Sequence, residues 1–538
     1  MKLKIITTPF LVVAVSLMVL SMKAQAFTIA SIGDSFASGE GNPDEPQRFD
    51  ALGFVKKGPV WADRQCHRSH IAAPEKAAIA IAGFLDQPLE FIGLACTGAR
   101  LDRGILEPYD PETDDLQNSL PAQINALRSR IGDKPIDVLL ISIGGNDVGF
   151  ADIIKKCIRM DSIALVRRNN ELCSRDSGVL AAIKSELAAL PQKYDRLADQ
   201  LKSMEIRQVM ITEYPDPTKG ANGSYCGENG NSRILFLHPL TAKWAEHEIV
   251  IPLNAAIGAA AERHGWVRVP VQAWSTTHGY CAGNARWFRT EEDARNIQGP
   301  YELGFSFQDS LPPGFQFSMG SLHPNPAGHD GIARRIMAAY VETGRMFDRS
   351  FYLASNSDVR QAVGSDPEAV LEHWKNHGLT EGRRGSREFD VKFYLANYPD
   401  LQNVFGTNYR AALGHWMSRG LPAEGRKGSR EFDVQVYLQT YPDLQERFGK
   451  NYAAVFDHWI KQGLPLEGRR GSREFDVRFY LNTYSDLQER FGENYSAALT
   501  HWILDGLAEG RLGVHTYHFR PLLFGDHRQH HYSPLLFQ

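Results

Sequence analysis

Hydrophobic patterning divides the chain into two parts. In the first part, short and nearly continuous apolar runs alternate with longer amphipathic or alanine-rich stretches, such as residues 73–85 and 177–204. This alternation predicts an α/β fold over residues 27–345, a three-layer α/β/α domain in which helices cover both faces of a parallel sheet. The runs that predict strands are FTIASI (27–32), LEFIGLA (89–95), IDVLLISI (136–143), QVMITEY (208–214) and WVRVPVQ (266–272).

The second part, residues 346–514, is a repeat array. The segment FDRSFYLASNSDV (347–359) recurs at 389–401, 432–444 and 475–487, which gives four helical repeats of about 43 residues each. Each copy ends in Gly-Leu followed by Glu-Gly-Arg. The aspartate after the first phenylalanine of each copy is suited to cap a short helix, so we expect an all-α array.

A His-Trp pair recurs once in each repeat. The pairs begin at His373, His415, His458 and His501. Tryptophan stacks on sugar faces, so exposed pairs would form a carbohydrate-binding platform. The helical spacing favours the other interpretation, in which the pairs pack in the core of each repeat.

The two ends of the chain stand outside this organisation. Residues 1–26 begin with Lys2 and Lys4, continue as an apolar run and end in Ala-Gln-Ala. This order is typical of a secretory signal peptide, with a retained anchor as the alternative, and no later run is of membrane-spanning length. We therefore expect a chain that is secreted, to the periplasm, the cell surface or the medium, and is not transmembrane after cleavage. The tail, residues 515–538, is rich in His and aromatic residues without regular ligand spacing, which favours an irregular end over a metal site.

Charge and cysteine content narrow the functional class. The formal net charge is −4, and the charged residues of segment 1–26 are all lysines, so the mature chain is more acidic and a poor candidate for nucleic-acid binding. An even number of cysteines in an exported chain favours three disulfides, but the spacing leaves their pairing open. No CxxC spacing points to a zinc site. The cysteines are Cys66, Cys96, Cys157, Cys173, Cys226 and Cys281.

Ser35 is the candidate nucleophile. It ends the triplet Gly-Asp-Ser directly after the first predicted strand, where the active site of an open parallel sheet is expected. An alcohol needs a base that accepts its proton and donors that hold the oxyanion. The α/β-hydrolase elbow G-x-S-x-G is absent, because Phe36 and Ala37 follow the serine. Three later segments supply candidates in order, namely Gly98 in ACTGAR, Asn146 in GGND, and His323 in SLHPNPAGH.

These four segments, in this order, resemble the SGNH (GDSL) hydrolase family. The resemblance implies that Ser35 is the nucleophile and His323 the general base. It also implies an oxyanion hole made of the backbone N–H groups of Ser35 and Gly98 and the side-chain amide of Asn146. No metal and no organic cofactor is expected from it.

One position departs from the family pattern. Most members carry an aspartate three residues before the catalytic histidine, where this chain has Gly320. The chain therefore resembles the secreted actinobacterial esterases and lipases that use a Ser–His dyad, which implies that the backbone carbonyl of Gly320 orients His323. The same subgroup implies disulfides in sequence order, namely Cys66–Cys96, Cys157–Cys173 and Cys226–Cys281.

Four other residues provide alternatives for these roles. His329 could replace His323 as the base, although its place in HPNPAGH is typical of a residue that starts a helix. Asp309 and Asp330 could each be the missing acid. Asp147 is expected to cap a helix rather than to act as an acid.

Three functions are consistent with the sequence. The first is a secreted carboxylic ester hydrolase that forms an acyl-serine intermediate and acts on lipid or short acyl esters. The second is a polysaccharide O-acetyl esterase that its repeats hold on a polymer or a cell-surface ligand. The third, from another class, is a surface adhesion protein whose α/β half is an inactive scaffold. The complete Ser, Gly, Asn and His set favours an enzyme, because a scaffold does not require it.

Overall fold

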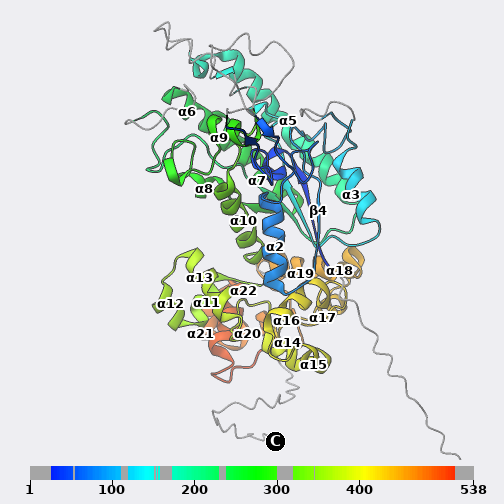
Figure 1. Cartoon of the computed structure of the whole chain (residues 1–538). Helices are drawn as coiled ribbons and strands as arrows, with labels where there is room; N and C mark the ends of the chain where they lie inside the picture. Colours follow the sequence, from blue (N-terminus) through cyan, green and yellow to red (C-terminus); the bar gives the residue numbers. More distant parts are fainter. Residues whose placement is uncertain are drawn as a thin grey trace, which may run out of the picture.

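A parallel sheet forms the centre of the first domain (Figure 1). The computed structural model describes residues 26–51, 55–110, 119–150, 153, 156–157, 172–228, 238–299, 319–343 and 346–514. Within these ranges the sheet has the strand order β4-β1-β5-β6-β7, and every neighbouring pair is parallel. Each strand overlaps one predicted run, so this prediction is confirmed. The strands are β1 (Phe27–Gly33), β4 (Leu89–Gly93), β5 (Val138–Ser142), β6 (Val209–Thr212) and β7 (Val267–Val269).

Helices cover both faces of this sheet, which confirms the predicted three layers. Helices α2 (Ala73–Leu85) and α10 (Pro326–Val341) pack against each other on one face (Figure 1). Helices α3 (Gln123–Ile131), α5 (Ser177–Leu201) and α7 (Ile251–His264) cover the other face. Strands β1 and β5 are buried along their whole length, which is why their sequences are continuously apolar.

Short elements fill the connections between the strands and long helices. They are α1 (Ser35–Ser38), β2 (Arg48–Phe49), β3 (Val55–Lys57), α6 (Pro239–Ala245), α8 (Gln272–Ser275), α9 (Glu291–Gln298), the π-helix η2 (Glu246–Val250) and the 3₁₀ turns η1 (Cys173–Arg175) and η3 (Gly283–Ala285). None of the helices in the described ranges combines the length and the apolar character needed to cross a membrane. The segment 1–25, Asp309 and the tail from 515 lie outside the described residues.

The second part is an all-α array, as predicted. Each repeat consists of three short helices followed by one π-helical turn. The helices are α11 (Arg349–Ser355), α12 (Ser357–Val363), α13 (Pro367–His373), α14 (Val391–Asn397), α15 (Pro399–Phe405), α16 (Tyr409–His415), α17 (Val434–Thr440), α18 (Pro442–Phe448), α19 (Tyr452–His458), α20 (Val477–Thr483), α21 (Ser485–Phe491) and α22 (Tyr495–His501). The π-helices are η5 (Trp374–Gly378), η6 (Trp416–Gly420), η7 (Trp459–Gly463) and η8 (Trp502–Gly506). The predicted caps are confirmed, because Asp348, Asp390, Asp433 and Asp476 accept backbone N–H groups of the helices they precede.

The repeated His-Trp pairs belong to the interior of the repeats. All four tryptophans are 1% exposed, so none of them can stack on a sugar. The Nδ1 atom of each paired histidine lies 2.9–3.1 Å from a buried tyrosine hydroxyl of the same repeat. The core-packing interpretation is confirmed, and the carbohydrate-platform interpretation is wrong for these pairs.

The array packs against the carboxyl end of helix α2 (Figure 1). The ring of Phe84 lies 5.7 Å from that of Trp374 in the first repeat, and Asn408 of the second repeat donates to Asp86 over 3.0 Å. Gly414 of helix α16 packs so closely that a Cβ atom there would lie 2.2 Å from the carbonyl oxygen of Leu85. The two parts therefore share a buried interface. That residues 27–345 also fold alone stays a prediction.

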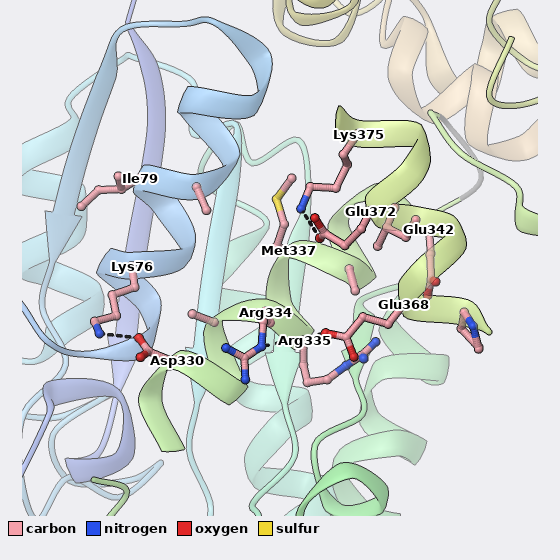
Figure 2. Close-up of a pocket in the computed structure, with 15 residues that line it drawn as sticks. Lys76, Ile79, Asp330, Arg334, Arg335, Met337, Glu342, Glu368, Glu372 and Lys375 are labelled. Atoms are coloured by element: carbon pink, nitrogen blue, oxygen red, sulfur yellow. Dashed lines mark hydrogen bonds and ion pairs between the residues drawn. The ribbon is translucent and has the colours of Figure 1, made fainter. Parts of the chain in front are cut away.

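Next to this interface, a cleft of about 380 Å³ lies between the first repeat and the α/β domain (Figure 2). Its walls come from helices α2, α10 and α13. Asp330 lines this cleft and pairs with Lys76, and Arg334 of α10 lies 4.0 Å from Glu368 of α13. Oppositely charged side chains thus connect the domain and the repeat at the surface.

The docking contact at Gly414 gives a testable prediction. The residue before the repeated histidine is Glu372, Gly414, Asp457 or Thr500, and Gly414 is the one that packs on the carbonyl oxygen of Leu85. We expect Gly414→Asp to lower the free energy of unfolding by about 1–3 kcal/mol, because the new side chain meets backbone that must move.

Thermal unfolding of the purified full chain measures this effect. Val404→Asp is the matched control in the same repeat, since Val404 is 73% exposed. An unchanged melting temperature for Gly414→Asp would contradict the docking contact.

Candidate active site

Ser35 lies at the carboxyl edge of the sheet, on the first turn after β1. Asp34 caps helix α1 by accepting the backbone N–H of Phe36 over 3.0 Å, and Ser35 is the first residue of that helix. The serine is 6% exposed. A strand that ends in a one-turn helix thus holds the hydroxyl at the place where open parallel sheets form their sites.

His323 reaches Ser35 from the loop before helix α10. Its Nε2 atom lies 2.8 Å from the Oγ atom of Ser35, and its Nδ1 atom lies 3.2 Å from the carbonyl oxygen of Ser321. With the Nδ1 proton donated to this carbonyl, the lone pair of Nε2 faces the serine hydroxyl. Burial lowers the pKa of His323, and the negative charge of Glu40 opposes that effect, so the imidazole is a free base at neutral pH.

The prediction that Gly320 supplies the orienting carbonyl is wrong. The Gly320 carbonyl accepts the backbone N–H of His323 over 3.3 Å and so closes a turn. Leu322 within this turn has a φ of 63°, a rare conformation for a branched side chain, and the turn presents the carbonyl of Ser321 to the ring. A Cβ atom at position 320 would lie 2.6 Å from the Cα atom of Gly41, so the loop has no room for an aspartate there.

The oxyanion donors predicted from the sequence come from three adjacent strands. Gly98 follows β4, Ser35 follows β1 and Asn146 follows β5, and these strands are neighbours in the sheet. Among the described residues, neither the Ser35 nor the Gly98 backbone N–H has a hydrogen-bond acceptor. The Asn146 amide donates to the carbonyl of Ala99 over 3.0 Å, which places it beside the Gly98 loop.

Two buried carboxyl groups support these loops. Both oxygens of Asp147 accept the backbone N–H of Leu101, at 2.9 and 3.2 Å, and Lys193 lies 3.0 Å away. The predicted helix-cap role of Asp147 is therefore wrong, because its side chain joins two loops. Burial raises the pKa of Asp34 to about 7, and its carboxyl accepts a hydrogen bond from the Tyr214 hydroxyl.

Tyr214 is a site residue that sequence reasoning missed. Its hydroxyl oxygen accepts a hydrogen bond from the Gly145 N–H over 2.9 Å, and the same hydroxyl donates a hydrogen bond to the Asp34 carboxyl. Tyr214 therefore connects the loops after β1 and β5. The only indication in the sequence is its position at the end of a predicted strand.

The alternative bases and acids lie elsewhere. His329 is fully buried, its Nδ1 atom accepts the N–H of Ala73 over 3.1 Å, and burial lowers its pKa to about 3. It is therefore a neutral structural side chain on helix α10. Asp330 pairs with Lys76 in the cleft of Figure 2, which leaves it no contact with His323 in the structure. In the described part of the chain no group of three or more His, Cys, Asp and Glu side chains could hold a metal ion.

An apolar crevice of about 10 Å³ lies next to Phe36, the residue after the serine. Phe36 forms part of it, and the Phe36 ring lies 5.2 Å from the ring of His323. Its other lining residues include Gly145, Tyr214, Leu253, Phe288 and Leu322. The volume of this crevice is about that needed for one water molecule, so the crevice has no room for an acyl chain in this structure.

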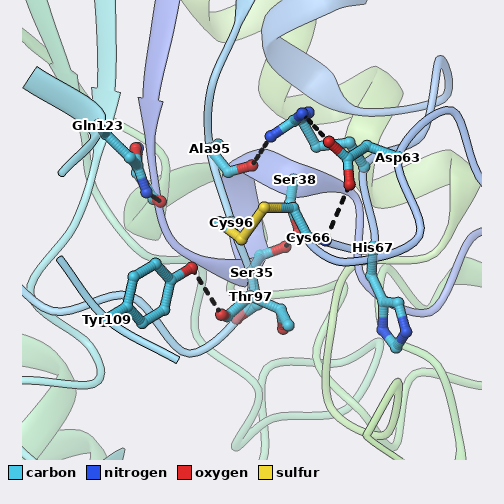
Figure 3. The surroundings of a disulfide bond; sticks show 12 residues. Ser35, Ser38, Asp63, Cys66, His67, Ala95, Cys96, Thr97, Tyr109 and Gln123 are labelled. Atoms are coloured by element: carbon cyan, nitrogen blue, oxygen red, sulfur yellow. Dashed lines mark hydrogen bonds and ion pairs between the residues drawn. A yellow bond between two sulfur atoms is a disulfide. The ribbon is translucent and has the colours of Figure 1, made fainter. Parts of the chain in front are cut away.

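Three disulfides are present in the structure. They are Cys66–Cys96, Cys157–Cys173 and Cys226–Cys281, the pairing that the resemblance implied. The first lies next to the site (Figure 3). Its Cys96 N–H donates to the Gly33 carbonyl over 3.0 Å, and the Thr97 N–H donates to the Cys66 carbonyl over 3.2 Å. This bond thus connects the loop of residues 61–70 to the loop that carries Gly98.

Ser35 is buried and hydrogen-bonded to His323 at the carboxyl edge of a three-layer α/β/α fold. This arrangement is typical of serine hydrolases. Residues 31–330 match the model of the GDSL-like lipase/acylhydrolase family. The match covers more than half of the chain, so the chain belongs to this family, whose members are ester hydrolases.

Individual relatives are distant. The chain is 25% identical to Lipase 1 of Streptomyces coelicolor over 261 residues, which cover 48% of this chain and 75% of that protein. Among solved structures it is similar to an extracellular lipase from Streptomyces rimosus, with 20% identity, a TM-score of 0.37 and coverage of 58% of this chain and 100% of that one. It is also similar to a phospholipase A1 from Streptomyces albidoflavus, with 19% identity, a TM-score of 0.36 and coverage of 58% and 98%.

The position of the first disulfide gives a prediction that separates it from the second. We expect the double variant Cys66→Ala/Cys96→Ala to lose about 2–4 kcal/mol of stability and also to lower kcat, because the Gly98 loop loses its covalent connection. Cys157→Ala/Cys173→Ala is the control, and it is expected to lose stability while kcat stays within about twofold.

Ester hydrolysis at a temperature where both variants are folded measures this difference. Equal kcat losses in the two double variants would contradict a specific role for Cys66–Cys96.

Proposed function

We propose that this protein is a secreted carboxylic ester hydrolase that acts through an acyl-serine intermediate on a Ser35–His323 dyad. The observation that supports it most strongly is the 2.8 Å contact between Ser35 Oγ and His323 Nε2, beside two backbone N–H groups that have no acceptor among the described residues. A scaffold without activity would not need this geometry, which disfavours the adhesion hypothesis.

The chemistry follows from the positions of these atoms. Nε2 of His323 accepts the Ser35 proton while Oγ forms a bond to the carbonyl carbon of the ester. The negative oxygen of the tetrahedral intermediate is held by the N–H groups of Ser35 and Gly98 and by the Asn146 amide. The imidazolium then gives its proton to the leaving alcohol, and a water molecule releases the acyl group by the same two steps.

The Ser321 carbonyl takes the place of the triad acid in this proposal. It accepts the Nδ1 proton over 3.2 Å and thereby keeps His323 in the tautomer that can act as a base. A carbonyl is neutral, so it stabilises the imidazolium less than a carboxylate would.

An ester with an apolar acyl group is the proposed substrate. The proposal is supported by the relative in Streptomyces coelicolor, which is named a lipase. Three disulfides and the apolar segment 1–26 support secretion. The polysaccharide hypothesis is weaker, because the tryptophans that would have bound a sugar are buried; a polymeric or cell-surface ligand of the repeats would need their outward-facing side chains.

Hydrolysis of 4-nitrophenyl acetate by the purified full chain tests the proposal. We expect Ser35→Ala and His323→Ala each to lower kcat by about a thousandfold or more, as removal of such groups typically does. Asn146→Ala should lower kcat by about a hundredfold with little change in KM, because its amide acts on the oxyanion.

Asp330→Ala and His70→Ala are the controls, since the first residue lies in the cleft and the second is a surface histidine. Both are expected to keep most of the activity. A loss at Asp330 as large as that at His323 would overturn the dyad.

A further inference from the structure

A buried carboxylate lies on the segment that packs against the His323 loop and has no role in the dyad as described so far. The Glu40 side chain is fully buried, five residues after the serine. One of its oxygens lies 2.8 Å from Nδ1 of His67, and the other accepts the amide of Gln298 over 2.8 Å. Burial of a carboxylate is costly unless it is paired and hydrogen-bonded, so both partners fix its position.

Hydrogen bonds to backbone carbonyls and close packing hold the Glu40 segment against the His323 loop. Asn42 donates to the carbonyl of Pro324 over 2.7 Å, and Gly41 packs directly on Gly320. Arg289 joins the two segments, because its backbone N–H donates to the His323 carbonyl over 2.8 Å and its side chain donates to the Gly41 carbonyl over 3.1 Å. Glu40 and His323 thus lie on segments that are hydrogen-bonded and packed together.

Glu40 is charged in this environment. Burial would raise the pKa of its carboxyl, but the hydrogen bonds of His67 and the Gln298 amide, and the positive charges that His67 and His323 carry when protonated, hold it at about 2. Its negative charge in turn raises the pKa of His323 against the effect of burial.

Other charged or titratable groups surround His323 as well. His67, when protonated, lowers the pKa of His323 through its positive charge. Arg289 and Glu291 come from the segment that pairs with the histidine loop, and Glu291 accepts a hydrogen bond from the Ser321 hydroxyl. His329 on helix α10 is neutral, as described above. Glu40 is the carboxylate among these groups that is both fully buried and fixed at both oxygens.

We propose that Glu40 is a positioning residue that supplies the negative charge which the Ser35–His323 pair lacks. The inference rests on the proposed function. When the Ser35 proton moves to Nε2, the negative charge of the Glu40 carboxylate stabilises the imidazolium through space, and the carboxylate accepts no proton. His67 and Gln298 keep the carboxylate in place, and the Ser321 carbonyl keeps the tautomer.

Two opposite substitutions test the proposal in the full mature chain. Glu40→Gln keeps the shape and the hydrogen-bonding oxygen but removes the charge, so kcat should fall by about tenfold or more and the acid limb of kcat/KM should move to lower pH. His67→Gln removes the neighbouring imidazole and the positive charge that it carries when protonated, so the acid limb should move to higher pH. Glu75→Gln is the matched control, because Glu75 forms the same 2.8 Å contact with His70 at the surface.

Direct titration of His323 separates this inference from the proposed function. NMR of histidine-labelled protein, with the His323 signal assigned by its loss in His323→Gln, reports the pKa of the ring whether or not the chain hydrolyses esters. Melting temperatures establish that each variant is folded.

We expect the His323 pKa to fall in Glu40→Gln, to rise in His67→Gln and to stay the same in Glu75→Gln. An unchanged pKa in folded Glu40→Gln would overturn the proposal, as would a fall produced instead by Glu291→Gln. If Glu40→Gln does not fold, a fall or no change in His67→Gln overturns it, and a rise supports it.

Discussion

The hydrogen bond between His323 and Ser35 joins residues 288 positions apart, and most of the fold around the site serves to hold its two ends. The serine end depends on strand β1, which is buried between β4 and β5 and stops at a capped one-turn helix. The histidine end depends on a loop held by Asn42 on one side and by the main chain of Arg289 on the other. A shift of about 1 Å at either end would separate donor from acceptor.

Charge is the second constraint on this pair. The loop at Gly320 packs on Gly41 too closely for an aspartate side chain, so the orienting group is a carbonyl. The same close packing brings the segment after the serine, with Glu40, against the histidine loop. The close packing that leaves no room for the usual aspartate thus also brings the Glu40 carboxylate close enough for its charge to raise the pKa of His323.

The strands and the repeats could be predicted from the sequence because burial on both faces and a fixed period leave clear patterns. The positions of Ser35 and Asn146 at the edge of the sheet could be predicted, since parallel strands end at one edge. His323 follows no strand, so its place beside Ser35 was implied by the family resemblance alone. The carbonyl of Ser321 could not be predicted, because it depends on the left-handed conformation of Leu322. Glu40, His67 and Tyr214 were missed because they lie in or beside irregular loops, where no periodicity indicates which side chains meet. The docking of the array could not be predicted for a similar reason. A single glycine at position 414, where the other repeats have Glu372, Asp457 and Thr500, gives no periodic pattern.

The most direct test of the central claim is the site of covalent labelling by a fluorophosphonate, which forms a stable bond to an activated serine. Peptide mapping of the labelled full chain by mass spectrometry identifies that residue. We expect a single adduct on Ser35, formed at least about a hundredfold more slowly in His323→Ala. An adduct on another serine, or equal labelling rates with and without the His323 imidazole, would contradict it.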